Sequence, residues 1–374
     1  MGRPHPPGPA PAQPADLELS LVLGGGNALG AYHLGACEAL LVAGWEPDWL
    51  IGTSIGAVTA AILAGNPPSR RLEQLQRFWD RARQPDLAAW WAVPQRLRTH
   101  YNNSHALAAL VGGRPGLYGA RYPGLYSLFP GMPPDRAIRD HAPLASTLNE
   151  LIDFDLLSSP GPRVSFVAID METGEEVWYD NREHRITPLH LLACTALAPL
   201  FPPVEIDGRL LCDAGFANNL PIDRVFRDRP TLGQLSIAVD LFCVSRGRPE
   251  TLDETVARVQ DLGFAMQTGR SVAALRREQD LLRRIEPGRP GSILAHLAYR
   301  APGSQRSLKA LDFSERSLRE RAAQGAADMN FMLHRIARET PDNGLVYLGP
   351  DPQPHHHGKN DAAASDVASS FYQA

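Results

Sequence analysis

A serine lies between two glycines at residues 52–56, in the sequence GTSIG, and this spacing is typical of a catalytic nucleophile. In the pattern G-x-S-x-G the glycines permit a sharp bend from a strand into a helix, with the serine at its apex. The Ser54 hydroxyl would then lie at the positive end of the helix dipole, which stabilises an alkoxide or a developing oxyanion. The alternative interpretation is that Ser54 only caps the helix, as serine often does.

A glycine cluster precedes this serine, in the sequence GGGNALG at residues 24–30. A dinucleotide-binding turn needs G-x-G-x-x-G, but from Gly24 the last glycine position is Leu29, and from Gly26 the second is Ala28. No G-K-[ST] follows, so the cluster is not a P-loop either. What remains is a turn with free backbone N–H groups at a helix N-terminus, which an oxyanion hole requires. A tight turn without a chemical role is the alternative.

Ser54 needs a proton acceptor, because a hydroxyl near its ordinary pKa is a weak nucleophile. The usual order in α/β hydrolases is serine, acid and then histidine, but no later histidine stands at an obvious strand end beside a glycine. The candidates are His100, His105, His141, His184, His190 and His296. His33 lies inside the expected first helix and is interpreted as a core residue. Asp213 has a better context, since it follows a short apolar strand in the sequence RLLCDAGF; the alternative is an ordinary Asx turn.

Glycine loop, serine and aspartate in this order resemble the patatin-like acyl hydrolases, whose patterns are G-G-G-x-R/K-G, G-x-S-x-G and D-G-A/G. The resemblance covers about residues 19–224 and includes the segments METGEEVWY and ACTALAPLFPPVEIDG. It implies a Ser-Asp dyad that attacks an acyl ester and forms an acyl-enzyme, which water hydrolyses without a metal or a cofactor. The implied roles are Ser54 as the nucleophile, Asp213 as the base, and Gly25, Gly26 and Asn27 as the oxyanion hole. Further motif positions are Gly24, Ala28, Leu29, Gly30, Gly52, Thr53, Ile55, Gly56, Ala214 and Gly215.

The chain departs from the family patterns within these motifs. Asn27 replaces the third glycine, and asparagine is the non-glycine residue that adopts positive φ most readily, so the turn is expected to survive. Leu29 replaces the basic residue, so we expect no cation near the oxyanion loop and leave phospholipid specificity open. The third motif contains Ala214 and then Gly215, a mild change that the family pattern allows.

The elements that would position these groups alternate between strand and helix. We expect apolar strands at 19–23 and 48–52, followed by helices at 28–43 and 54–64. This order with short links indicates a parallel sheet with right-handed crossovers. Both turns then lie at the carboxyl ends of strands, where such folds bind ligands. Further helices are expected at 70–83, 187–199, 251–285 and 314–337, and further strands at 163–169, 210–212, 235–242 and 293–299. Residues 84–134 are interpreted as irregular.

We therefore predict an α/β fold, a patatin-like three-layer α/β/α sandwich with a mainly parallel central sheet. The catalytic domain is expected at 17–240. The region of about 240–333 resembles an extension found in one bacterial branch of the family, which indicates a C-terminal α/β extension at 241–345. Proline-rich residues 1–16 and polar residues 346–374 are expected to be disordered.

The composition excludes several classes of protein. With 44% hydrophobic and 21% charged residues the chain can form a core, and a formal charge of −4 indicates no nucleic-acid partner. The cysteines lack C-x-x-C spacing, so we expect free thiols in a cytoplasmic protein. No apolar run reaches the ~18 residues of a membrane span. Trp90 and Trp91, beside Arg96 and Arg98, suggest peripheral contact with a membrane surface or a lid over an acyl pocket, and packing against the core is the alternative.

These observations favour a serine acyl-ester hydrolase that acts on lipid or related esters, as a lipid acyl hydrolase or phospholipase A does, with no cofactor or metal. The alternative is a non-catalytic lipid-binding or scaffolding protein on the same fold, which the changes at Asn27 and Leu29 motivate. An ordinary Ser-His-Asp hydrolase is a third interpretation, and it would require one of the later histidines.

Overall fold

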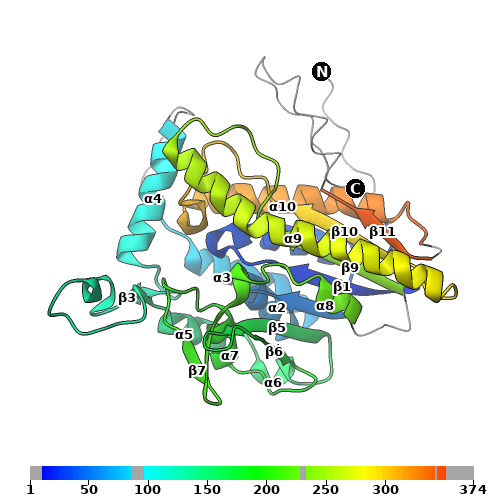
Figure 1. The fold of residues 1–374 in the computed structure, drawn as a ribbon, viewed down its shortest axis with the longest axis horizontal. Coiled ribbons are helices and arrows are strands. Elements are labelled where there is room, and N and C mark those ends of the chain that lie inside the picture. The colour runs from blue at the N-terminus through cyan, green and yellow to red at the C-terminus, as the bar shows by residue number, and fades with distance from the viewer. Residues whose placement is uncertain (1–10, 86–93, 95–96, 228–232, 342, 351–374) are drawn as a thin grey trace.

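The computed structural model describes residues 11–85, 94, 97–227, 233–341 and 343–350. Figure 1 shows a central sheet with helices on both faces, so the described chain has three layers. The helices are α1 (Ala31–Val42), α2 (Ile55–Ala64), α3 (Arg71–Ala82), α4 (Arg98–Gly112), α5 (Ala142–Leu151), α6 (Phe154–Leu157), α7 (Pro188–Cys194), α8 (Asp223–Arg227), α9 (Leu252–Ile285) and α10 (Glu315–Ile336). The strands are β1 (Leu17–Leu23), β2 (Trp49–Gly52), β3 (Gly119–Ala120), β4 (Arg139–Asp140), β5 (Arg163–Asp170), β6 (Glu176–Asp180), β7 (Val204–Ile206), β8 (Arg209–Asp213), β9 (Gly233–Asp240), β10 (Ser292–Ala298) and β11 (Leu345–Leu348).

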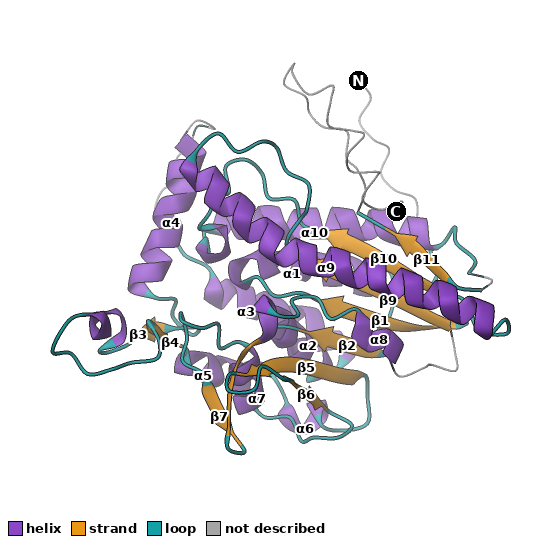
Figure 2. Cartoon of the chain, in the orientation of Figure 1, coloured by secondary structure: helices purple, strands orange, loops and turns teal. Residues whose placement is uncertain are grey.

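The central sheet is mainly parallel, as predicted. Its strand order is β11-β10-β9-β1-β2-β5-β8-β7, and β6 pairs with β5 outside this path. The strands from β11 to β5 run parallel, whereas β6, β7 and β8 form antiparallel pairs (Figure 2). The chain passes from β1 to β2 on one side and later returns to β9 on the other side of β1. This change of direction creates a crevice at the carboxyl end of β1, where open α/β sheets bind ligands.

The two faces of the sheet are both covered, which explains why its central strands are continuous apolar runs. In β1, Leu19, Leu21 and Leu23 contribute to a large core with α1, α2 and α10. Val22 points to the opposite face, where α8 and α9 cover a second and smaller core. Strands β10 and β11 continue the same sheet, so the residues after 240 add to both its edge and its covering layers.

Helices α1 and α10 cross with their backbones in contact. A Cβ atom added to Gly35 would lie 1.7 Å from the Ala322 carbonyl oxygen, and one added to Gly325 would lie 2.1 Å from the Tyr32 carbonyl oxygen. Both distances are far below a normal contact, so each helix needs a glycine at the crossing. This crossing brings the N-terminal half of α10 up to the loop that follows β1.

The prediction that residues 84–134 are irregular is partly wrong, because this segment contains helix α4. The first turns of α4 are rich in residues of modest helix propensity, which hid the helix from the sequence pattern. Tertiary contacts stabilise it instead: Arg98 donates to Glu320 on α10 at 2.6 Å, and Ala106 and Ala109 are buried. The predicted contact through Trp90 and Trp91 lies outside the described residues, as do residues 1–10 and 351–374.

No helix in the described part of the chain is both long and apolar enough to cross a membrane.

Candidate active site

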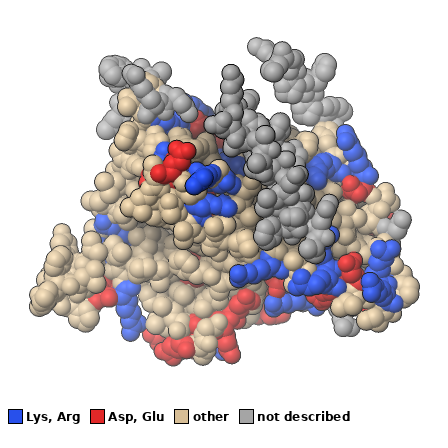
Figure 3. Space-filling model, turned by 45° about the horizontal axis from the view of Figure 1, so that its top comes forward, with Lys and Arg blue, Asp and Glu red and all other residues tan. Residues whose placement is uncertain are grey.

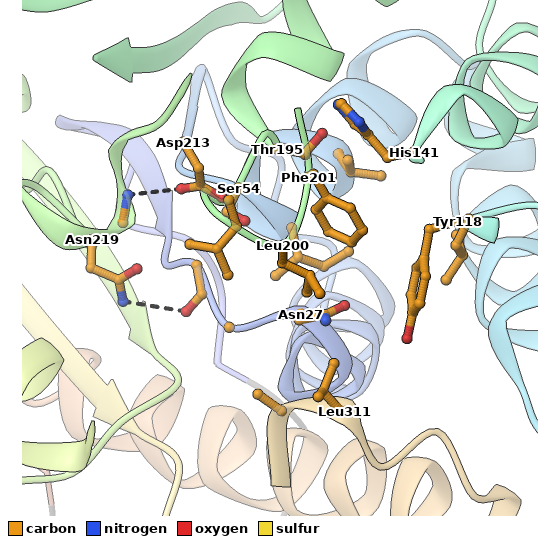
Figure 4. A pocket seen from close by; sticks show the side chains of 18 of the residues that line it. Asn27, Ser54, Tyr118, His141, Thr195, Leu200, Phe201, Asp213, Asn219 and Leu311 are labelled. Atoms are coloured by element: carbon orange, nitrogen blue, oxygen red, sulfur yellow. Dashed lines mark hydrogen bonds between the residues drawn. The ribbon is translucent and has the colours of Figure 1, made fainter. Parts of the chain in front are cut away.

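Strand register places Ser54 and Asp213 at the same height in the sheet. Gly52, the last residue of β2, pairs with Phe166 in β5. Two residues further along β5, Ala168 pairs with Asp213, the last residue of β8. Continuing the β2 register by two residues brings Ser54 level with Ala168, so the two functional groups face each other across β5. Figure 4 shows the Ser54 side chain next to the Asp213 carboxyl group.

Ser54 occupies the sharp bend that its motif predicts. Its φ of +56° is the strained conformation of a residue at the apex of such a turn. A Cβ atom on Gly52 would lie 2.4 Å from the Ala57 amide nitrogen, and one on Gly56 would lie 2.0 Å from the Leu23 carbonyl oxygen. The motif therefore needs both glycines because the backbones of β1, β2 and α2 meet here. The Ser54 side chain makes no capping hydrogen bond to α2, which leaves its hydroxyl free of the capping role.

The glycine loop after β1 is held against Asn219. The Gly25 amide donates to the Asn219 carbonyl at 3.2 Å, and Asn219 Nδ2 donates to the Gly25 carbonyl at 3.2 Å. A side chain at residue 25 would lie 2.6 Å from Asn219 Oδ1 and 3.0 Å from Ser54 Cβ, so this position has room only for glycine. Asn27 has a φ of +51°, as expected for the residue that replaces the third glycine. The amides of Gly26 and Asn27 donate to no other residue in the described chain, so they are the free donors of this loop.

Asp213 is a buried carboxyl group with one oxygen engaged and one oxygen available. Its Oδ1 accepts a hydrogen bond from the Gly215 amide at 2.7 Å, which is the Asx-type turn considered above. Its Oδ2 has no hydrogen bond of ordinary geometry within the described residues, although it is buried. Burial raises the pKa of Asp213 to about 6, and the nearby hydroxyl of Ser54 and the Gly215 amide act in the opposite direction. A carboxyl group with this pKa can exchange protons near neutral pH.

A cavity of about 320 Å³ extends from these residues into the core. Ser54 and Asp213 lie on one side of it and Tyr118 on the other (Figure 4). Its wall is mostly apolar and comes from elements throughout the chain. The apolar lining includes Ile55, Val58, Phe78, Trp79, Leu117, Leu144, Leu197, Leu200, Phe201, Phe216, Phe242, Phe264, Leu308, Leu311 and Phe313. Such a wall suits a hydrocarbon chain, and the polar atoms of the wall at its Ser54 end suit an ester group.

Among the histidines in the described chain, His141 lines this cavity. Its Nε2 is hydrogen-bonded to the Leu192 carbonyl at 3.1 Å, its ring stacks on Phe201, and burial lowers its pKa. Its Nε2 is therefore engaged by a backbone carbonyl and not by Ser54. His33 is fully buried, as expected for a core residue.

Two residues of helices α9 and α10 reach the site, and the local motifs gave no signal for them. Gln267 on α9 donates to the carbonyls of Gly215 and Phe216 at 3.3 and 3.2 Å and accepts from the Asn219 amide at 3.0 Å. It thus braces the turn that carries Asp213.

Arg321 on α10 supports the glycine loop after β1. Its Nη1 donates to the Ala28 carbonyl at 3.0 Å and to the Asp312 carbonyl at 2.8 Å, and its side chain is fully buried. The expectation that no cation lies near this loop is therefore wrong. Leu29, at the position of the basic residue in the family pattern, is buried in the core. The guanidinium next to this loop comes from far along the chain instead.

The remaining motif positions lie in the same three turns. The Gly24 amide closes the end of β1 on the Val239 carbonyl, and Thr53 Oγ1 donates to the Asn218 carbonyl at 3.1 Å. Ala28, Leu29 and Gly30 form a single 3₁₀ turn with Asn27, Ile55 begins α2, and Ala214 and Gly215 begin a short 3₁₀ turn after β8. No group of three or more His, Cys, Asp or Glu side chains in the described chain is arranged to hold a metal ion.

Comparisons with known proteins agree with this arrangement of motifs. A model of the patatin-like phospholipase family matches residues 21–226. The chain is 26% identical over 209 residues to patatin-like phospholipase domain-containing protein ZK370.4 of Caenorhabditis elegans, and 25% identical over 207 residues to neuropathy target esterase sws of Drosophila melanogaster. Each match covers 55% of this chain and 12% of the relative, so this chain matches a small part of each relative.

Solved structures that match this chain include human GIVD cytosolic phospholipase A2, with a TM-score of 0.42 at 15% identity over 86% of this chain and 60% of that chain. VipD from Legionella pneumophila gives a TM-score of 0.38 at 14% identity over 86% of this chain and 67% of that chain. The segment matched by the family model is more than half of the chain and contains the glycine loop, Ser54 and Asp213. This chain belongs to the patatin-like phospholipase family.

Proposed function

We propose that this protein hydrolyses carboxylic esters of lipids with a Ser54–Asp213 dyad, as a lipid acyl hydrolase of the phospholipase A kind. The observation that carries the proposal is that a buried carboxyl oxygen without an ordinary hydrogen bond faces the serine at the polar end of an apolar cavity. The cavity would hold the acyl chain, and its volume lies near the lower end of the range of about 300–1,000 Å³ for ligand pockets.

In the first half of the reaction, Ser54 Oγ attacks the ester carbonyl carbon while its proton passes to Asp213 Oδ2. The negative charge that develops on the carbonyl oxygen is stabilised by the free amides of Gly26 and Asn27 and by the positive end of α2. When the tetrahedral intermediate collapses, the alcohol leaves with the proton from Asp213 and the acyl group stays on Ser54.

In the second half, water attacks the acyl-enzyme and gives its proton to Asp213, and Ser54 regains that proton when the fatty acid leaves. The same carboxyl group therefore serves as base and then acid in each half. Its pKa of about 6 suits both tasks, because a group that titrates near the working pH gives up and takes up protons with little cost.

Hydrolysis of p-nitrophenyl esters by purified wild-type protein, Ser54→Ala and Asp213→Asn tests this function. Both variants should lose activity by about 10²–10⁴-fold or more, since each removes one member of the proton-transfer pair. A fluorophosphonate probe should label the wild type at Ser54. Equal turnover by all three proteins would refute the proposal, and absence of labelling in folded protein would favour a non-catalytic lipid-binding role.

We also propose that residues 241–345 act as an extension whose task is to brace the site, because Gln267 and Arg321 lie in this region and bond to its loops.

A further inference from the structure

A loop between β3 and β4 projects from the body of the molecule and carries large apolar side chains into solvent. Figure 1 shows it at the left edge, away from the sheet, and Figure 3 shows the same lobe without charge at its tip. Tyr122 and Leu128 are each 78% exposed. The exposed apolar side chains of the loop are Tyr122, Leu125, Tyr126, Leu128 and Phe129.

The charges of this loop are confined to its base. Residues 122–134 contain no charged side chain. Arg121 directly precedes this segment, and Asp135 and Arg136 directly follow it. Arg121 and Asp135 form an ion pair at 2.8 Å that joins the two ends of the loop, and the Gly124 amide donates to Asp135 at 3.0 Å. The tip is therefore an apolar aromatic surface held on a closed base, with Arg136 exposed beside it.

The base of the loop is also part of the wall of the acyl cavity. Tyr118 precedes β3 and His141 follows β4, and both line the cavity. The Arg139 amide in β4 donates to the carbonyl of Leu200, another lining residue, at 2.8 Å. A continuous wall thus runs from the cavity beside Ser54 to the exposed tip.

The apolar area of the tip is smaller than one side of an average protein interface, and the tip has the composition of a membrane-interface segment. An aromatic side chain buries about 150–250 Å² when covered, so these three aromatic and two leucine side chains, which are more than half exposed, offer at most on the order of 600 Å². A standard protein interface buries about 800 Å² on each partner. Tyrosine and phenylalanine, mixed with leucine and followed by arginine, favour the boundary between lipid headgroups and acyl chains.

We propose that residues 122–129 insert into the surface of a lipid bilayer and hold the cavity against it. This proposal rests on the proposed function, because a lipid hydrolase would take its substrate from the membrane surface that the loop contacts. The binding itself does not require catalysis, so it can be measured without turnover.

Sedimentation with phosphatidylcholine vesicles, with and without phosphatidylglycerol, tests the proposal in a Ser54→Ala background that leaves the lipid intact. The loop variant is Leu128→Gln/Phe129→Gln. The matched control is Leu281→Gln/Ile285→Gln, which removes two exposed apolar side chains from α9 on another part of the surface. We expect the loop variant to lose at least tenfold in vesicle affinity and the control to keep the affinity of the parent protein.

Three outcomes would overturn the proposal: no vesicle binding by the parent protein, equal binding by the loop variant, or an equal loss in the control. Self-association of the parent protein that the loop variant abolishes would also overturn it, because the loop would then be a contact between copies. The same substitutions with Ser54 intact should keep the rate on soluble p-nitrophenyl butyrate, since neither Leu128 nor Phe129 lines the cavity. If no protein hydrolyses this ester, the proposed function fails while the vesicle result still stands.

Discussion

Replacing Asp213 by asparagine should remove activity and stabilise the folded protein at neutral pH. Asp213 is buried, and burial raises its pKa from the ordinary 3.8 to about 6. Above this pH the group is ionised in both the folded and the unfolded protein, so the folded state bears the cost of a buried charge. About two pH units at about 1.4 kcal/mol each give a cost of about 3 kcal/mol.

The sign of the pH dependence follows from the direction of this shift. Well below pH 4 the carboxyl group is protonated in both states and the penalty is absent, and near pH 4 the penalty is still small because the folded group stays protonated. As the pH rises through about 6, the folded state must ionise and the penalty becomes complete. The asparagine side chain is neutral throughout, and its oxygen can keep the bond from the Gly215 amide. The free energy of unfolding of Asp213→Asn should therefore exceed that of the wild type by about 3 kcal/mol near pH 8 and by less than about 1 kcal/mol near pH 4.

Urea unfolding followed by tryptophan fluorescence at about pH 4, 6 and 8 measures this difference. Asp280→Asn on α9 is the control, because Asp280 is exposed and its replacement should change the free energy of unfolding little at any of these pH values. In the same range, kcat/KM of the wild type should fall below about pH 6 and reach about a tenth of its plateau near pH 5. The reasoning is refuted if Asp213→Asn is no more stable than the wild type near pH 8, or if its gain does not change with pH.

Further predictions concern the cavity, the braces and the helix crossing. Among p-nitrophenyl esters, kcat/KM should rise roughly fourfold per methylene, which is about 0.8 kcal/mol each, until the cavity is full; a flat series would argue against an acyl pocket. Arg321→Met breaks the contacts of a buried guanidinium and should lower the free energy of unfolding by about 3–5 kcal/mol in urea and reduce kcat more than it raises KM. His141→Phe should keep more than a tenth of kcat in the ester assay, whereas a loss as large as that of Ser54→Ala would indicate a triad. Gly325→Ala should lower the free energy of unfolding by about 1–3 kcal/mol or more through the clash with α1, and the thermal midpoint with it, while Gly269→Ala, where a Cβ meets open space, should raise the midpoint.

Local patterns predicted the sharp turn at Ser54 and the turn of the glycine loop well, because the conformation of each depends on a few consecutive residues. The glycines around Ser54 are fixed by backbone contacts within one strand-turn-helix unit, and Asn27 adopts the positive φ that its residue type favours. The alternation of apolar runs and helical periods likewise predicted the parallel strands, since both faces of these strands are buried.

Features that depend on distant segments were not predicted. Helix α4 was missed because contacts with α10, more than its own sequence, stabilise it. Asn219, Gln267 and Arg321 support the site through bonds to loops far away in the chain, so no short motif contains them. That the apolar side chains of residues 122–129 gather into one projecting tip was also not predicted, because a sequence does not show how such side chains are arranged in space.

The sequence by itself determined that a serine and a glycine-rich turn stand at the ends of two strands, and it marked Asp213 as a polar residue at the end of a third. Only the tertiary structure decided that these groups share one level of the sheet, because the height of Asp213 follows from the antiparallel register of β8 on β5. Burial by surrounding elements then set the pKa of that carboxyl group, and α9 and α10 fixed the loops around it. Strand ends follow from local preferences, whereas register and burial arise when distant segments pack together.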